Sequence, residues 1–113
     1  MSALSLEDRL GAINRLRQRV WVYDFDNVTV AWSNQGALEL WQSDSLAALQ
    51  ARDLKSDMTE TVSKRLRQYQ TDFLRDETIQ FREIWTLYPN GQPSTVEVVF
   101  GALWLDDGRM GMI

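Results

Sequence analysis

Residues 20–41 read VWVYDFDNVTVAWSNQGALELW, a stretch in which two strand-like runs, a tight turn and an Asn-led helix follow one another. Residues 20–25 are β-branched and aromatic, and residues 28–32 resume that pattern after the turn residues Asp26 and Asn27. Asn34 then stands at an N-cap position ahead of an apolar helical run. The stretch therefore predicts a β-hairpin that leads directly into a helix.

An amphipathic helix is predicted before the hairpin, over residues 5–19. Ser5 and Asp8 have capping-box spacing, and Gly11 weakens the helix by about 1 kcal/mol relative to alanine. The helix either covers part of its own domain or forms a dimer contact, and the sequence leaves both roles open. Its apolar residues, which are the candidates for a dimer interface, are Leu6, Leu10, Ile13 and Leu16.

A helical block follows the hairpin. Residues 46–50 form a short helical segment, and the longest helix is predicted over residues 58–75. Asp57 and Glu60 have capping-box spacing at its start. Four side chains recur at steps of four, three and four, and we expect them to lie against a sheet. These four are Val62, Leu66, Tyr69 and Phe73.

The second half of the chain changes to a strand pattern. Residues 78–88 and 95–104 are rich in β-branched and aromatic residues, and the loop 89–93 joins them as a hairpin. After a turn at residues 106–108, residues 109–113 begin a third strand. This order predicts an α+β fold with one five-stranded antiparallel sheet, short helices on one face and the N-terminal amphipathic helix.

The predicted division of the chain is residues 1–19 for that helix and residues 20–113 for the domain proper. Because the sequence stops inside an apolar strand, we expect a fragment of a longer polypeptide that carries a downstream domain.

Composition limits the classes of function. The formal net charge of −4 and the pI near 4.7 argue against nucleic-acid binding, which needs clustered Lys and Arg. No apolar run approaches the roughly 20 residues that span a bilayer, and no signal peptide is evident. We therefore expect a cytoplasmic protein without membrane insertion in this segment.

The chain contains no His and no Cys. These side chains supply most zinc ligands, nucleophile–base pairs and haem anchors. Their absence excludes a Ser-His-Asp triad and cysteine redox chemistry. It also excludes haem held by His.

Six segments together resemble the PAS sensory-box family. They are VWVYDFDN, AWSNQGALELW, ARDLKSDM, RLRQY, EIWTLYPNGQP and DDGRMGM, and they extend from Val20 to Ile113. The resemblance is to PAS domains that precede diguanylate cyclase, nucleotide cyclase or histidine kinase output domains in bacterial signalling proteins. It implies a five-stranded sheet curled around short helices, a core that can hold a small molecule, signalling through dimer contacts and the last strand, and no catalysis. Without Cys, the cysteinyl-flavin photochemistry of some relatives is excluded.

A ligand pocket is expected between the central helices and the third strand. Its candidate lining residues, each of which could equally be plain core, are Leu38, Trp41, Leu54, Met58, Leu66, Tyr69 and Trp85. Asn34 is read as a helix cap and Arg82 as a solvated strand residue, although either could orient a polar ligand. The cofactor is unknown, and the five Trp residues leave a non-covalent flavin open as an alternative to ordinary packing.

Strand alternation indicates two apolar sheet faces. Trp21, Tyr23 and Phe25 share one face, whereas Val20 and Val22 share the other. Two apolar faces need two covers, which favours a homodimer as a hypothesis. The sequence thus predicts a non-catalytic sensory or regulatory module that binds a small molecule, dimerises, or both, to control a downstream output domain. The alternatives are a purely structural dimerisation domain and a small cone-shaped α+β enzyme with a carboxyl group of raised pKa.

Overall fold

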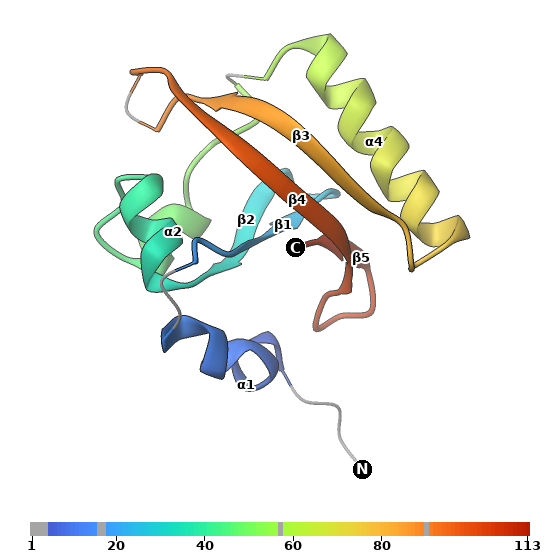
Figure 1. Cartoon of the computed structure of the whole chain (residues 1–113), viewed down its shortest axis with the longest axis horizontal. Helices are drawn as coiled ribbons and strands as arrows, with labels where there is room; N and C mark the ends of the chain where they lie inside the picture. The colour runs from blue at the N-terminus through green and yellow to red at the C-terminus, as the bar shows by residue number, and fades with distance from the viewer. Residues whose placement is uncertain (1–4, 16–17, 57, 90) are drawn as a thin grey trace.

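In the computed structural model, which describes residues 5–15, 18–56, 58–89 and 91–113, five antiparallel strands form a sheet (Figure 1). The strand order is β2-β1-β5-β4-β3, so the last strand of the sequence occupies the centre of the sheet. The strands are β1 (Trp21–Asp24), β2 (Thr29–Ser33), β3 (Gln80–Leu87), β4 (Ser94–Trp104) and β5 (Met110–Met112). The α+β fold and its five-stranded antiparallel sheet agree with the sequence prediction.

The first hairpin differs in detail from its prediction. Its turn occupies residues 25–28, because the Asp24 carboxylate accepts hydrogen bonds from the backbone N–H groups of Asp26 and Asn27 at 3.0 and 3.1 Å. Val28, predicted as strand, has a φ of 54° and belongs to this turn. The polar side chain at the end of β1 therefore ends the strand earlier than the apolar pattern suggests.

The helical block contains α2 (Gln35–Leu40), α3 (Leu46–Gln50) and α4 (Glu60–Arg75). Asn34 caps α2 as predicted, since its side chain accepts the N–H of Ala37. The prediction for α4 was wrong at its start. The Thr59 side chain caps this helix by accepting the N–H of Val62, whereas Asp57 lies outside the described residues.

The single helix predicted over residues 5–19 is also wrong. The structure has a short α-helix, α1 (Leu6–Leu10), followed by a 3₁₀ helix, η1 (Gly11–Arg15). The change occurs at Gly11, whose lack of a side chain favours a break in helical geometry. The predicted cap at Ser5 is confirmed, because its hydroxyl accepts the N–H of Asp8.

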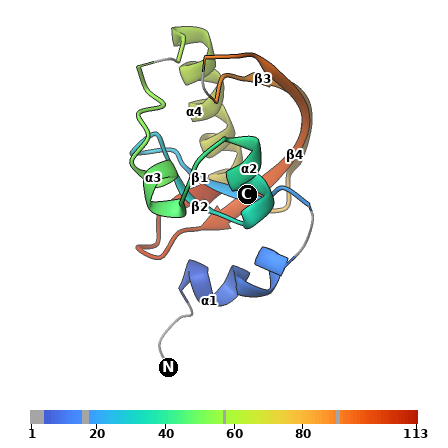
Figure 2. The same cartoon turned by 90° about the vertical axis from the view of Figure 1, so that its left-hand side faces the viewer.

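The helices cover the two faces of the sheet unequally (Figure 2). We call the face toward α2, α3 and α4 the inner face. Phe73 of α4 is fully buried there with Tyr23 of β1 and Phe100 of β4. Leu6 and Leu10 of α1 pack on the opposite, outer face against Val22 and Trp32. Alternate residues of β1 thus enter two separate cores.

The predicted dimer contacts of the N-terminal segment are used inside this chain. Leu6 and Leu10 are 7% and 6% exposed, and Ile13 is partly buried against the same cluster. Leu16 lies outside the described residues. The segment covers the β1–β2 half of the outer face, whereas Ile84 of β3 and Val99 of β4 remain 75% and 52% exposed on the other half.

An ion-pair cluster around Arg109 connects two turns at one end of the sheet. Both guanidinium NH₂ groups of Arg109 bind the Asp24 carboxylate, at 2.7 and 2.8 Å, and Nε binds Asp107 at 2.6 Å. This cluster joins the β1–β2 turn to the β4–β5 turn. In the described part of the chain, no helix has the length and apolar character needed to cross a membrane.

Candidate functional site

A cavity of about 380 Å³, here called the inner pocket, lies between the inner face of the sheet and the start of α4. Five of the expected pocket residues line it: Trp41, Leu54, Met58, Leu66 and Trp85. Its volume is near the lower end of the range of about 300–1,000 Å³ that small-molecule sites occupy. The inner pocket is therefore the candidate ligand site.

The walls of the inner pocket follow from strand and helix periodicity. Trp21 and Tyr23 of β1 point to the inner face, and so does Trp85 of β3. The rings of Trp21 and Trp41 meet edge to face, with centroids 5.9 Å apart and an interplanar angle of 89°. Leu66 on α4 completes an aromatic and aliphatic wall suited to a flat apolar group.

Charged and polar side chains gather at one side of the pocket. Arg65 lines it, and one of its guanidinium nitrogens lies 3.9 Å from a Glu83 carboxylate oxygen. The same carboxylate accepts hydrogen bonds from the Tyr69 hydroxyl and, at 2.8 Å, from Nε1 of Trp85. Glu83 therefore anchors one wall of the pocket to α4.

The electrostatics of this group favour a charged Glu83 carboxylate beside the neutral phenol of Tyr69. Burial opposes ionisation of Glu83, yet hydrogen bonds from Tyr69 and Trp85 and the charge of Arg65 hold its pKa below the ordinary value. Burial and the bond to Glu83 raise the pKa of Tyr69. Burial, followed by the charge of Asp24, raises the pKa of Tyr23 to about 12. A general acid would need the opposite shift at Glu83.

Four of the residues proposed from the sequence do not line the pocket. Leu38 packs on the cluster around Trp41 and Leu49. Tyr69 is 6% exposed in the main core and reaches the site only through Glu83. Arg82 points from the outer face, where it pairs with Glu97 at 3.1 Å.

Asn34, the fourth of these residues, has a structural role. Its Oδ1 accepts the N–H groups of Val20 and Ala37, each at 3.0 Å, and its Nδ2 donates to the carbonyls of Ile13 and Gln18 at 3.2 and 2.6 Å. All of its amide hydrogen-bonding capacity is thus directed to neighbouring backbone.

The sequence interpretation missed several lining residues. Trp21, Thr59 and Arg65 line the inner pocket and were not proposed. The sequence pattern could have identified two of these residues, because Trp21 lies in the alternating run of β1 and Arg65 is one residue before Leu66 on the same helix. The sequence pattern could not show that β1 and β3 line the same cavity, because this depends on the tertiary arrangement of the strands.

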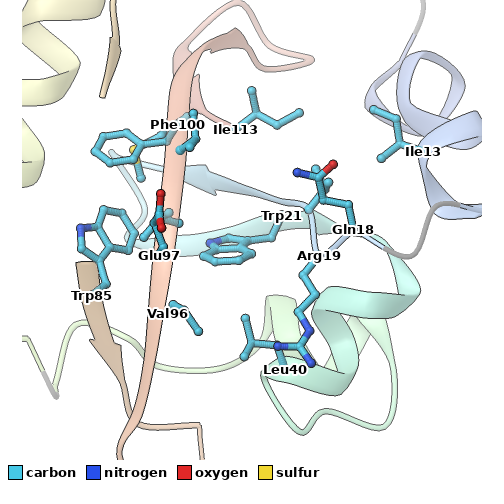
Figure 3. Close-up of a pocket in the computed structure, with 14 residues that line it drawn as sticks. Ile13, Gln18, Arg19, Trp21, Leu40, Trp85, Val96, Glu97, Phe100 and Ile113 are labelled. Carbon is cyan, nitrogen blue, oxygen red and sulfur yellow. The ribbon is translucent and has the colours of Figure 1, made fainter. Parts of the chain in front are cut away.

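A second cavity, here called the slot, has a volume of about 750 Å³ and lies between β1 and β4 (Figure 3). It is lined by the consecutive residues 18–21 and 96–100, and by Met112 and Ile113 at the end of β5. Trp21, Trp85 and Met112 line both cavities, so the slot and the inner pocket share walls.

Within the described residues, no group of three or more Asp and Glu side chains is arranged to hold a metal ion. Asp24 and Asp26 both form ion pairs with Arg109. A comparison with protein-family models finds no family that matches this chain, and a comparison with curated proteins finds no relative. The functional argument therefore depends on the fold and on the two cavities.

Proposed function

We propose that this chain is a PAS-like sensory or regulatory module that binds a small molecule in the inner pocket and controls an output domain in a bacterial signalling protein. The observation that carries the proposal is the aromatic-walled pocket of about 380 Å³ between the inner sheet face and α4. The quoted PAS-like segments, and a sheet with a helical block between its two hairpins, support the family assignment.

The pocket wall suggests how occupancy reaches the sheet. Trp85 belongs to β3 and Met112 to the central strand β5, while Leu66 belongs to α4. A ligand that prefers one arrangement of these three elements shifts the population toward that arrangement. The module controls its output by this shift and performs no chemistry on the ligand.

Native mass spectrometry of the freshly purified chain tests the proposal. We expect a reproducible extra mass on the folded chain. Leu66→Trp fills the pocket and should abolish that mass, whereas Leu74→Trp adds the same side chain at a 58% exposed position of α4 and should retain it. Circular dichroism of both variants checks that the fold is intact. A bare mass for the parent chain, or an extra mass that survives Leu66→Trp, contradicts binding in this pocket.

The alternative is a purely structural dimerisation domain, and the exposed outer half of the sheet favours it. Ile84 and Val99 are large apolar side chains on that surface. If this face pairs two copies, Val99→Lys should convert a dimer into a monomer in analytical ultracentrifugation. A monomeric parent chain at high micromolar concentration would remove this alternative.

A further inference from the structure

Arg65 carries the only formal charge among the described residues that line the inner pocket. The other lining residues of the described chain have aromatic, aliphatic, thioether or hydroxyl side chains, and none is a carboxylate. A ligand that is complementary to this wall therefore has a largely apolar body and a negatively charged group.

The Arg65 guanidinium has donors to spare for such a group. In the described chain, its nearest carboxylate oxygen belongs to Glu83 and lies 3.9 Å from a guanidinium nitrogen, which is longer than a hydrogen bond. A guanidinium presents five N–H donors in a planar fork, so one edge can face Glu83 while another binds an anion. The Arg65 side chain is 62% exposed, and this contact therefore forms at the mouth of the pocket.

The carboxylate of Glu83 is already engaged by other donors. One of its oxygens accepts the hydroxyl of Tyr69, and the other accepts Nε1 of Trp85 at 2.8 Å. These two bonds hold Glu83 behind the wall, and it is not among the residues that line the pocket. A bound anion consequently meets the guanidinium of Arg65 and not the carboxylate beside it.

The charged side of the pocket is built by α4 and β3. Arg65 and Leu66 are consecutive residues of α4, and Glu83 belongs to β3. β3 is an edge strand of the sheet, separated from the central strand β5 by β4. The position of the guanidinium thus depends on the middle and late segments of the chain that form this helix and this strand.

We propose that the ligand of the inner pocket is a small aromatic carboxylate, with its carboxylate on Arg65 and its ring against the aromatic and aliphatic wall. A carboxylate offers two oxygens to the guanidinium fork. A single cation matches the one charge of a carboxylate, whereas a phosphate monoester carries up to two. The inference rests on the proposed function, since it names the class of ligand for the same pocket.

Three flat probes that share two fused rings and differ in one polar group test this class. At neutral pH, 2-naphthoate is an anion, 2-naphthamide is neutral and 2-naphthylmethylamine is a cation. Titration of each into the ¹⁵N-labelled chain, followed at the indole N–H signals of Trp21, Trp41 and Trp85, gives its dissociation constant. We expect naphthoate to bind about tenfold or more tightly than naphthamide, and the amine to bind most weakly, because only the anion forms a charge-assisted pair.

Variants of two arginines on α4 assign the preference to one side chain. Arg65→Gln should weaken naphthoate binding to the level of naphthamide and leave naphthamide binding unchanged. Arg67→Gln makes the same change at an exposed position outside the pocket lining and should alter neither. Arg65→Lys keeps the charge and should retain most of the preference for naphthoate. Thermal unfolding of each variant checks that the fold is intact.

Leu66→Trp, which fills the pocket, should abolish binding of naphthoate and naphthamide. If both bind equally to the parent chain and both are lost in this variant, the inner pocket is a ligand site, but the inferred class of ligand is wrong. Equal weakening of naphthoate by Arg65→Gln and Arg67→Gln would indicate attraction by the helix surface as a whole and would also overturn the inference.

Two further results decide against the inference. Naphthoate binding that survives Leu66→Trp places the anion outside the pocket, and naphthoate that fails to bind at millimolar concentration excludes the class. Failure of the proposed function is distinguished from these results, because it appears as binding of none of the three probes together with a bare mass of the parent chain.

Discussion

At the scale of single residues, Asn34 joins more of the fold than its role as a cap implies. It is fully buried, and its amide binds the backbone of Ile13, Gln18, Val20 and Ala37. One side chain therefore fixes the end of η1, the entry into β1 and the start of α2. The sequence predicted the bond to α2, because caps are local, but the other three partners are 14 to 21 residues away.

Replacement of Asn34 by alanine should lower the free energy of unfolding by about 3 kcal/mol, because a helix cap and several buried partners are lost together. Ser45→Ala removes the cap of α3 at an exposed position and should cost about 1 kcal/mol. Urea denaturation of both variants measures the difference. Equal losses would show that the bonds beyond the cap contribute nothing.

The Asp24–Arg109 pair gives the fold a dependence on acid. Burial opposes ionisation of Asp24, but the hydrogen bonds from Arg109 and Asn27 lower its pKa below the ordinary value of 3.8. A carboxyl whose pKa is lowered by folding stabilises the fold above its unfolded pKa, and this contribution is lost as the pH falls through the folded pKa.

The parent chain should therefore lose stability as the pH falls below about 4. Asp24→Asn should cost about 2 kcal/mol at pH 7, because a charge-assisted pair is weakened, and should flatten this acid dependence. Thermal unfolding of both proteins between pH 2 and pH 7 provides the measurement. Parallel pH profiles would mean that other carboxyls cause the acid sensitivity.

At the scale of elements, the position of β5 depends on a glycine. A β-carbon at Gly111 would lie 2.9 Å from the carbonyl oxygen of Tyr23 and 2.8 Å from a methyl carbon of Leu105. The strand therefore approaches β1 too closely for a side chain at this position. At Gly101, by contrast, the nearest atoms to such a carbon are 3.6 Å away, an ordinary contact.

Gly111→Ala should consequently destabilise the protein by about 2 kcal/mol or more, since backbone must move to relieve the overlap. Gly101→Ala makes the same chemical change in a neighbouring strand and should be neutral or slightly stabilising. Chemical denaturation compares the two variants. A similar loss in both would indicate a general cost of alanine in these strands instead of a close approach.

Element boundaries show what periodicity alone can predict. The alternation in β3 and the spacing in α4 identified both elements to within about two residues. The helix at residues 5–19 failed because the spacing of Leu6, Leu10 and Ile13 suits a helix but also fits a short α-helix followed by a 3₁₀ turn. Packing on Val22 and Trp32 selects the second arrangement.

At the scale of the whole molecule, the fold class followed from the order of the elements, whereas the cavities did not. Hairpins at both ends of a helical block indicated one antiparallel sheet. Both the inner pocket and the slot are lined by Trp21 and Trp85, which are 64 residues apart in the sequence and come to the same cavities only through the strand order. Local sequence patterns carry no information about this long-range arrangement.

The central place of β5 also bears on how the chain folds during its synthesis. Tyr23 pairs with Met112, so the first hairpin gains this neighbouring strand only after residues 110–112 have left the ribosome. Closing so long a loop slows folding, and until then the edges of β1 and β4 are both open to other chains. We therefore expect the nascent domain to be most vulnerable to aggregation just before residues 110–112 emerge.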